Sequence, residues 1–411
     1  MTTITIQPGL LSGTVVPPSS KSISHRLILC AALARGTSTI RNLSFSQDVL
    51  ATLHCAEGLG ATWVRLDNSS VEITGIGGLP KPGALPILPC GESGSTLRFL
   101  IPIALAVAGG GVFTGSKRLM ERPLKPYFDL FDQKGIAYEQ KEGTLTIRGE
   151  LTAGEYPIPG NVSSQFLTGL LMALPLVEGN STVLLTTPLE SRDYVSLTLE
   201  AQGDAGVAIC KVGNRFRVPG GQSYETQDRA VEADWSQAAV WYQAIAYGNQ
   251  VELEGMNAFS SQGDMAVVSK YLRLIKPGNV EIDVSQCPDL VPPLAAMAAL
   301  RSGTTRVVNA GRLRIKESDR LATVTEVLNA LGARVEEYPD SLTIHGRDRL
   351  EGGVSIDCHN DHRIAMMAAV AATRCEKPVT LVGAECVNKS YPSFWEHYRM
   401  LGGKLDVLVS G

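Results

Sequence analysis

Six polar clusters lie along the chain, and each carries hydroxyl, amide or carboxylate side chains that can contact an anion or transfer a proton. They occupy residues 19–26, 91–98, 161–165, 232–236, 287–289 and 360–363. Ser, Asp and Asn also cap helices, so any single cluster can be a helix cap and nothing more. The first cluster goes further, because it places Lys21 and Arg26 among four serines. Cations beside hydroxyls at a helix start are typical of a phosphate or carboxylate site.

Further basic residues precede helical patterns elsewhere in the chain. Arg122 lies before one such pattern, Lys389 before another, and Lys316 and Arg320 at the start of a third. If that third helix begins at residue 317, the four-residue spacing of Lys316 and Arg320 puts them on one face. A surface charge pair remains the better interpretation of residues 117–118. Together, the sets favour a binding cleft for anions.

Gly94 and a pair of histidines each allow two interpretations. Gly94 is either a flexible turn residue or a point of close backbone approach to a ligand, and its neighbours Ser95 and Arg98 favour the second. The sequence GxxxxGK[ST] is absent, so ATP is not implied. His359 and His362 lack a matching set of further ligands, so we expect no metal.

The clusters begin helices of a unit that recurs six times, at intervals of roughly 55–75 residues. Each unit has an apolar helix, a turn, a β-rich segment, a second helix and one or two short strands. The predicted first helices span residues 27–33, 96–108, 166–176, 238–247, 294–300 and 364–373. The predicted second helices span residues 47–57, 123–134, 194–202, 265–274, 317–331 and 393–401. The first β segments are residues 37–40, 112–114, 182–185, 251–253, 305–308 and 379–382.

Hydrophobic periodicity predicts how these helices pack. Residues 364–372 are apolar all round, which predicts a central buried helix. The helix at 317–331 is amphipathic, with one apolar face made of Leu321, Val324, Val327, Leu328 and Leu331. With three units per domain, six helix N-termini would converge on one cleft. Ordinary α/β alternation without true repeats is the alternative.

Bulk composition limits the class of protein. A length of 411 residues predicts two domains. The first residues resemble neither a signal nor a transit peptide, and no apolar run is long enough to span a membrane. Eight scattered cysteines without a CxxC pair are typical of a reducing cytoplasm. A net charge of −4 and a pI near 5.9 argue against a nucleic-acid partner.

Eight segments together resemble the EPSP synthase family of enolpyruvyl transferases over nearly the whole chain. They are residues 20–26, 91–98, 121–123, 163–166, 288–289, 316–320, 360–363 and 388–389. The resemblance implies an α/β fold: a two-domain inside-out α/β barrel of six βαβαββ units, three per domain, with buried helices pointing to the interdomain cleft. It implies a discontinuous domain of residues 1–19 and 234–411, with the phosphoenolpyruvate side and the catalytic acid and base. Residues 20–233 would form an inserted domain, mainly on the shikimate 3-phosphate side.

The resemblance also implies a reaction and its residues. The enolpyruvyl group of phosphoenolpyruvate would pass to the 5-hydroxyl of shikimate 3-phosphate, with release of phosphate. The implied shikimate 3-phosphate contacts are Lys21, Ser22, Arg26, Ser163, Ser164, Gln165, Ser191, Tyr194, Asp289 and Lys316. The implied phosphoenolpyruvate contacts are Lys21, Gly94, Arg122, Gln165, Arg320, Arg363 and Lys389. Asp289 resembles the proton acceptor and Glu317 the proton donor, and Lys21 is a third catalytic candidate.

Two carboxylates whose environments separate their pKa values suit this chemistry. Glu317 lies between two cations that lower its pKa, so desolvation or substrate charge must keep it able to deliver a proton. No cofactor is expected, and a monomer is the expected state. Glu92 and Arg312 replace residues frequent in the family, and their roles stay open.

Three competing functions remain at this point. The related enzyme that acts on UDP-N-acetylglucosamine carries a reactive cysteine in the loop of the second unit, whereas residues 91–123 contain none. A non-catalytic anion-binding protein would not need both Asp289 and Glu317. An RNA-end-processing relative is disfavoured by the acidic pI.

Overall fold

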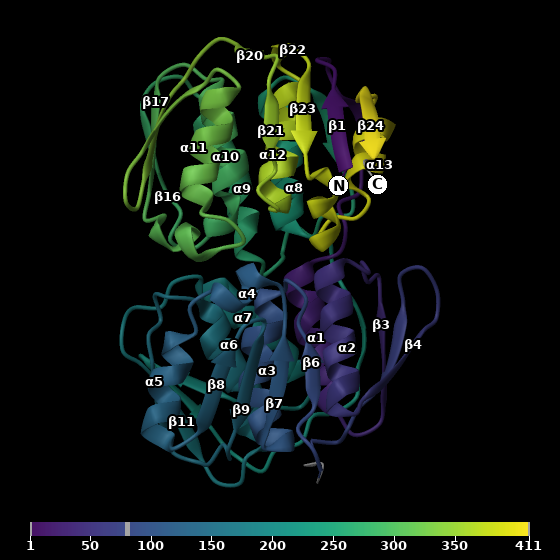
Figure 1. Ribbon diagram of the computed structural model, residues 1–411, viewed down its shortest axis with the longest axis vertical. Coiled ribbons are helices and arrows are strands. Elements are labelled where there is room, and N and C mark those ends of the chain that lie inside the picture. The colour runs from purple at the N-terminus through teal and green to yellow at the C-terminus, as the bar shows by residue number, and fades with distance from the viewer. Residues whose placement is uncertain (1, 79–82, 410–411) are drawn as a thin grey trace. The chain divides into compact units, whose positions relative to one another are not determined.

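The computed structural model describes residues 2–78 and 83–409 (Figure 1). The chain forms two compact units. The inserted unit comprises Ser19–Glu232, and the discontinuous unit comprises Met1–Pro18 and Ala233–Gly411. Among the described residues, no helix has the length and apolar character that a membrane crossing requires.

The inserted unit places its helices against three sheets (Figure 1). The helices are α1 (Lys21–Leu33), α2 (Gln47–Leu59), α3 (Gly94–Ala108), α4 (Lys117–Glu121), α5 (Lys125–Lys134), α6 (Ser164–Ala173) and α7 (Arg192–Asp204), with the 3-10 turn η1 (Leu174–Leu176). The strands are β3 (Thr37–Arg41), β4 (Thr62–Arg65), β5 (Val71–Thr74), β6 (Ile87–Pro89), β7 (Gly110–Thr114), β8 (Ala137–Lys141), β9 (Thr144–Arg148), β10 (Glu155–Ile158), β11 (Ser181–Leu185), β12 (Cys210–Val212), β13 (Arg215–Val218) and β14 (Asp228–Ala230).

The discontinuous unit joins the first strands of the chain to its C-terminal half. Its helices are α8 (Trp235–Ala246), α9 (Val267–Leu274), α10 (Val291–Ala299), α11 (Arg320–Ala330), α12 (His362–Ala372) and α13 (Phe394–Met400), with the 3-10 turns η2 (Gly263–Ala266), η3 (Pro288–Leu290), η4 (Gly311–Ile315) and η5 (Ala384–Lys389). Its strands are β1 (Thr2–Ile6), β2 (Ser12–Val15), β15 (Gln250–Leu253), β16 (Val280–Asp283), β17 (Thr304–Val308), β18 (Arg334–Glu337), β19 (Leu342–His345), β20 (Leu350–Gly352), β21 (Ser355–Asp357), β22 (Cys375–Lys377), β23 (Val379–Val382) and β24 (Leu405–Val409).

One strand pattern recurs in five four-stranded sheets of the described chain. Each sheet begins with a parallel pair, and two antiparallel neighbours follow, as in β16-β17-β19-β18. The other four orders are β14-β3-β5-β4, β6-β7-β9-β8, β10-β11-β13-β12 and β21-β23-β1-β24. This repetition overturns the alternative of ordinary α/β alternation, because unrelated segments would not share both order and direction.

The fourth copy of the unit departs from the predicted pattern. There β15 pairs only with β2, in a two-stranded parallel sheet. After α9 the chain passes directly to β16, which belongs to the next sheet. The fourth copy therefore lacks the last two strands of the unit, because the segment between α9 and β16 contributes no strands of its own.

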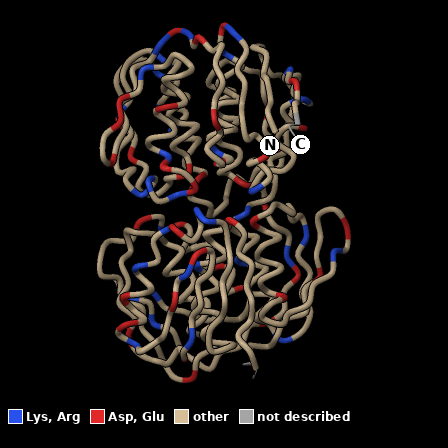
Figure 2. Tube along the Cα trace, viewed as in Figure 1, with Lys and Arg blue, Asp and Glu red and all other residues tan. Residues whose placement is uncertain are grey.

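The predicted burial of the helices is confirmed. Every residue of α10 and of α12 is buried, and the predicted apolar face of α11 is buried as well. Burial of an apolar side chain stabilises a fold by about 1.5–3 kcal/mol, so an all-apolar helix belongs in the centre. Figure 2 shows the central helices largely free of charged residues along their length.

Five of the six polar clusters cap a helix through a side-chain oxygen. Ser20, Ser93, Ser163, Asp234 and Asp361 each accept a hydrogen bond from a backbone N–H in the first turn of α1, α3, α6, α8 and α12. The remaining cluster, residues 287–289, does not cap α10, whose N-cap Leu290 offers no side-chain acceptor. The Asp289 carboxylate is therefore available for another role.

Most predicted helix starts are shifted by a few residues, and two of these shifts change where candidate site residues lie. The helix expected from residue 317 begins at Arg320, because Asp319 accepts from the Ala322 N–H at 3.2 Å and sets the cap there. Lys316 therefore precedes the helix, and the argument from a shared helical face fails. The helix expected from residue 123 begins at Lys125, and Arg122 lies between α4 and α5.

Candidate active site

One buried guanidinium organises the carboxylates of the discontinuous unit. Arg320 is only 1% exposed, and its Nη1 and Nη2 lie 2.9 Å from Asp289 Oδ1 and 2.8 Å from Glu317 Oε2. Its Nε lies 2.8 Å from Oδ2 of Asp361, a fully buried carboxylate. Burial alone would lower the pKa of Arg320, but these three carboxylates raise it above its usual value. The two residues predicted to transfer protons thus share one permanently charged partner.

Asp289 lies among several cations. Besides Arg320, Lys316 Nζ lies 3.1 Å from its Oδ1, and Arg363 Nη2 lies 3.6 Å from its Oδ2. Burial opposes ionisation of Asp289, yet Lys316, Arg363 and Arg320 together hold its pKa well below the usual value. Burial also lowers the pKa of Lys316, and Asp289 only partly offsets that effect. Lys316 and Arg320 both contact Asp289, which lies in the 3-10 turn η3.

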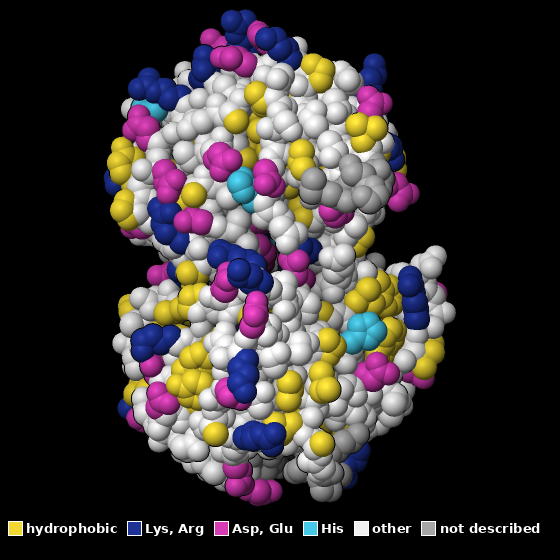
Figure 3. Space-filling view, viewed as in Figure 1, with side chains coloured by type: hydrophobic (Ala, Val, Ile, Leu, Met, Phe, Trp, Pro, Cys, Tyr) yellow, Lys and Arg dark blue, Asp and Glu magenta, His cyan; other side chains and the backbone are white. Residues whose placement is uncertain are grey.

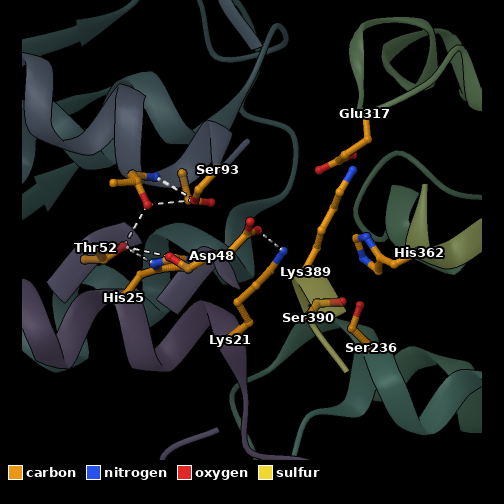
Figure 4. A network of polar contacts seen from close by, with 12 residues as sticks. Lys21, His25, Asp48, Thr52, Ser93, Ser236, Glu317, His362, Lys389 and Ser390 are labelled. Carbon is orange, nitrogen blue, oxygen red and sulfur yellow. Dashed lines mark hydrogen bonds and ion pairs between the residues drawn. The ribbon is translucent and has the colours of Figure 1, made fainter. Parts of the chain in front are cut away.

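Arg363 and Lys389 are positioned by hydrogen bonds to neighbouring elements. The Arg363 guanidinium donates to Ser236 Oγ at 2.7 Å and to Ser236 O at 3.2 Å, which ties α12 to the start of α8. Lys389 Nζ donates to the carbonyl oxygen of Asn360 at 2.5 Å. In Figure 4, Lys389 and Ser390 extend from adjacent positions. All these contacts hold cations near the N-terminus of α12, a position that favours anions.

In the inserted unit, α1 presents two cations within its first two turns. Lys21 Nζ lies 2.8 Å from Asp48 Oδ2, as Figure 4 shows. Arg26 donates from Nε to Thr198 Oγ1 at 2.9 Å, from Nη1 to Ser22 O at 2.6 Å and from Nη2 to Tyr194 O at 2.7 Å. Burial lowers the pKa of Arg26 to about 10, so it remains charged at neutral pH.

Ser191 adopts an unusual backbone conformation beside this group. Its φ of 52° is left-handed, and its side chain is buried. Non-glycine residues in that region cost of order 1–3 kcal/mol and cluster at functional sites. Ser191 is the N-cap residue of α7 and lies one turn before Tyr194.

Gln165 is fixed by residues of α3. Arg98 Nη1 donates to Gln165 Oε1 at 2.7 Å, and Gln165 Nε2 donates to Ser95 Oγ at 2.9 Å. Ser163 Oγ accepts from the Gln165 N–H at 3.3 Å, and Ser164 begins α6. The α3 and α6 starts are thereby joined within the inserted unit.

Gly94 is required by a close approach rather than by a turn. It begins α3, and its backbone is not left-handed. A Cβ at this position would lie 2.6 Å from Arg122 Nη1. The interpretation as a flexible turn residue is therefore wrong. The approaching group is the Arg122 guanidinium itself.

We predict that Gly94→Ala displaces Arg122. Because the added methyl group must push the guanidinium by several tenths of an ångström, the KM for the anion that Arg122 holds should rise roughly tenfold, while kcat falls less. Steady-state kinetics with both substrates varied would measure this. Gly203→Ala is a matched control in the same unit, because a Cβ there meets nothing within 4 Å. Equal KM values for Gly94→Ala and wild type would contradict the prediction.

Several residues that contact candidate site residues were not predicted from the sequence. Arg98 and Asp361 lie inside the polar clusters at residues 91–98 and 360–363, but neither was predicted as a substrate contact. Asp48 lies in the first turn of α2 and carried no signal at all. Arg312, whose role was open, donates from Nη2 to Ser285 O, and Glu92 lies in the turn before α3.

Two features identified in the sequence lie outside the clusters of candidate site residues. Lys117 and Arg118 are exposed on α4, as expected for surface charges, and Figure 3 shows basic and acidic side chains intermingled on the viewed face of each unit. His359 Nε2 lies 3.3 Å from Glu326 Oε2, whereas His362 is buried at the start of α12. Within residues 2–78 and 83–409, no group of three His, Cys, Asp or Glu side chains could hold a metal ion.

The structure therefore defines a repeated α/β protein with cations clustered at helix N-termini in both units and two candidate proton-transfer carboxylates in one. Comparisons with known proteins identify its family. The family model for EPSP synthase (3-phosphoshikimate 1-carboxyvinyltransferase) matches residues 6–281 and 274–398. The chain belongs to this family, and the predicted resemblance is confirmed.

Individual relatives agree over nearly their full length. The chain is 44% identical to the 3-phosphoshikimate 1-carboxyvinyltransferase of Clostridium kluyveri, over 98% of both chains. It is 43% identical to the enzyme of the same name from Clostridium beijerinckii, over 99% of both. Among solved structures, EPSP synthase from Acinetobacter baumannii superposes with a TM-score of 0.81 at 26% identity, over 100% of both chains. These relatives confirm the α/β fold class and the assignment as a transferase.

Proposed function

We propose that this protein transfers the enolpyruvyl group of phosphoenolpyruvate to the 5-hydroxyl of shikimate 3-phosphate and releases phosphate. The observation that carries the proposal is the pair of carboxylates, Asp289 and Glu317, held on one buried guanidinium. An anion-binding protein without catalysis would need the cations but not two carboxylates placed among them.

The reaction needs one acid and one base at the same time. In the addition step, Glu317 protonates C3 of phosphoenolpyruvate, Asp289 takes the proton of the attacking hydroxyl, and the new C–O bond forms at C2. In the elimination step, Glu317 takes a proton back from C3, the C–O bond to phosphate breaks, and phosphate departs with the proton that Asp289 took earlier. Each carboxylate therefore returns to its starting state, as general acid–base catalysis requires.

The remaining residues supply charge complementarity. Each substrate carries a phosphate and a carboxylate, so several cations are needed, and Arg offers a bidentate contact where Lys offers a point charge. We assign shikimate 3-phosphate to Lys21, Ser22, Arg26, Ser163, Ser164, Gln165, Ser191, Tyr194, Asp289 and Lys316. We assign phosphoenolpyruvate to Lys21, Gly94, Arg122, Gln165, Arg320, Arg363 and Lys389. The discontinuous unit then supplies the acid and base, and the inserted unit supplies most shikimate 3-phosphate contacts.

The low pKa of Asp289 poses a problem that the substrates themselves resolve. A carboxylate held ionised by Lys316 and Arg363 is a weak base. Anionic substrates compete for those same cations, because a phosphate carries more charge than one carboxylate. As Lys316 and Arg363 turn toward the substrates, the pKa of Asp289 rises and its basicity increases.

This mechanism predicts different pH profiles for the free enzyme and the complex. The acid limb of kcat/KM reports the free enzyme, and that of kcat reports the complex. Activity requires ionised Asp289, so both quantities fall as the pH decreases. We expect kcat to fall at a higher pH than kcat/KM, because Asp289 has the higher pKa in the complex. If the acid limbs of kcat and kcat/KM coincide, or if kcat/KM falls at the higher pH, Lys316 and Arg363 do not turn from Asp289 to the substrates.

The most direct test of the function mixes the purified protein with shikimate 3-phosphate and phosphoenolpyruvate and follows phosphate release. Release that depends on both substrates supports the proposal. Release only when UDP-N-acetylglucosamine replaces shikimate 3-phosphate would favour the related enolpyruvyl transferase. Calorimetric binding of both substrates without release would indicate a binding protein.

We further propose a monomer that works in a reducing cytoplasm without a nucleic-acid partner. All eight cysteines are free, and seven of them are buried. Free thiols packed in a core are typical of a reducing compartment.

A further inference from the structure

A chain of buried hydroxyls joins three helices of the inserted unit at their N-terminal halves. His25 Nδ1 on α1 lies 2.7 Å from Thr52 Oγ1 on α2, and Thr52 Oγ1 lies 2.7 Å from Thr96 Oγ1 on α3. Thr96 Oγ1 donates to Ser93 Oγ at 2.7 Å. All four side chains are fully buried. Figure 4 shows His25, Thr52 and Ser93 linked by these bonds.

The direction of the chain follows from counting protons. A threonine hydroxyl has one proton, and Thr96 gives its proton to Ser93. Thr96 must then accept from Thr52. The other acceptor near Thr52 Oγ1, the carbonyl oxygen of Asp48, is farther away at 3.3 Å, so Thr52 gives its proton to Thr96 and accepts from the imidazole. His25 therefore carries its proton on Nδ1.

Two observations agree with this direction. A neutral imidazole has one N–H, so Nε2 must be bare, and Nε2 of His25 has no hydrogen-bond partner in the described chain. Burial, together with the nearby charges of Lys21 and Arg26, holds the pKa of His25 well below its usual value. The imidazole is therefore neutral and can donate from Nδ1 alone.

The last member of the chain acts directly on the start of α3. Ser93 Oγ also accepts from the Thr96 N–H at 3.2 Å, which is the N-cap bond of α3. The next residue is Gly94, whose Cα faces the Arg122 guanidinium. A shift of the cap therefore moves the surface against which Arg122 packs.

We propose that His25 is a positioning residue, which through Thr52 and Thr96 fixes the Ser93 cap and so the placement of Gly94 against Arg122. The first turn of α1, with Lys21, and the start of α3 are thereby held in register. No member of the chain needs to touch a substrate. This inference rests on the proposed role of Gly94 and Arg122 in holding phosphoenolpyruvate.

The test replaces the middle of the chain with an isostere. Thr52→Val keeps the shape of the side chain but can neither accept from His25 nor donate to Thr96. Because one buried donor is left unpaired and the cap loosens, we expect the KM for phosphoenolpyruvate to rise roughly tenfold. The KM for shikimate 3-phosphate and kcat should change less than threefold. Thr52→Ser retains the hydroxyl and should restore the KM.

A matched variant separates positioning from a general loss of stability. Ser38 is a buried hydroxyl of β3 that accepts from the Gln227 N–H at 3.1 Å, and it lies just beyond the C-terminal end of α1. Ser38→Ala should lower the melting temperature without raising either KM. A similar rise in the KM for phosphoenolpyruvate in Ser38→Ala and Thr52→Val would overturn the inference.

Two further measurements keep the inference falsifiable. Nitrogen-15 NMR of the wild-type protein should show His25 as the Nδ1–H tautomer, and the Nε2–H tautomer would overturn the chain even if Thr52→Val fails to fold. Arg122→Ala tests the underlying assignment. If Arg122→Ala leaves the KM for phosphoenolpyruvate unchanged, the proposed site is wrong. If it raises that KM while Thr52→Val does not, only the positioning role is wrong.

Discussion

Asp289→Asn is expected to lower kcat by on the order of 10²–10⁴ while the protein stays folded. The amide has nearly the size of the carboxylate but cannot take the proton of the attacking hydroxyl. The fold should survive, because Arg320 keeps Glu317 and the fully buried Asp361 as partners. Phosphate release under saturating substrates would measure kcat, and thermal unfolding would check the fold.

Glu317→Gln is the companion variant for the acid role. It should lower kcat by a similar factor, since C3 is then left without its proton donor. Glu326→Gln offers a control of the same type on the exposed side of α11, where Glu326 Oε2 lies 3.3 Å from His359 Nε2. Near-normal turnover in both Asp289→Asn and Glu317→Gln would refute the assignment of acid and base.

Arg320→Leu is expected to cost about 3–5 kcal/mol in the free energy of unfolding and to abolish turnover. The guanidinium is 1% exposed, and its removal leaves the carboxylate of Asp361 buried without its cation. A buried charge that loses its partner is among the most destabilising changes in a protein core. Urea unfolding at neutral pH would measure the cost.

Arg314→Leu is the matched control for this experiment. Arg314 also pairs with two carboxylates, Asp319 at 2.9 Å and Glu337 at 2.8 Å, but its side chain is 31% exposed. Water screens such pairs, so its loss should cost no more than about 1 kcal/mol. If the two variants lose equal stability, the buried cluster contributes no more than a surface ion pair.

The pH dependence of the free energy of unfolding provides an independent test of the Arg320→Leu prediction. In the wild type, burial opposes ionisation of Asp361, but Arg320 holds its pKa below the usual 3.8. Its stabilising contribution is therefore present above pH 3.8 and is lost as the pH falls through the lower folded pKa. Without Arg320, burial and the nearby charge of Glu317 raise that pKa, and His362 opposes them only in part. Protonation then relieves the variant, so the stability gap to wild type should narrow as the pH decreases from 7 toward 4.

Local patterns made much of the fold predictable. Apolar periodicity located the helices, and the all-apolar segment at residues 364–372 correctly indicated burial on every side. Five polar clusters were caps, as Ser and Asp before an apolar run suggest. These features depend on residues within one or two turns of each other, so they are readable from sequence. The eight segments shared with EPSP synthases indicated the family.

Other features depend on packing between distant segments and could not be read in advance. The sequence placed Lys316 and Arg320 on one helical face, whereas the cap at Asp319 leaves Lys316 in the preceding loop. Both still reach Asp289, because η3 packs beside the start of α11. Likewise, nothing local marked Asp48 as the partner of Lys21, 27 residues earlier.

The basic and acidic residues show most clearly which features the sequence determines and which features the tertiary structure determines. Sequence alone determined that hydroxyls, cations and carboxylates gather at the starts of buried helices, since helix capping and apolar burial are short-range effects. Only the tertiary structure decided which charges pair, because Arg320 meets Asp361 across 41 residues of chain and is buried with it. Charge pairing in a core depends on which elements pack together, and that is a property of the whole unit rather than of any segment.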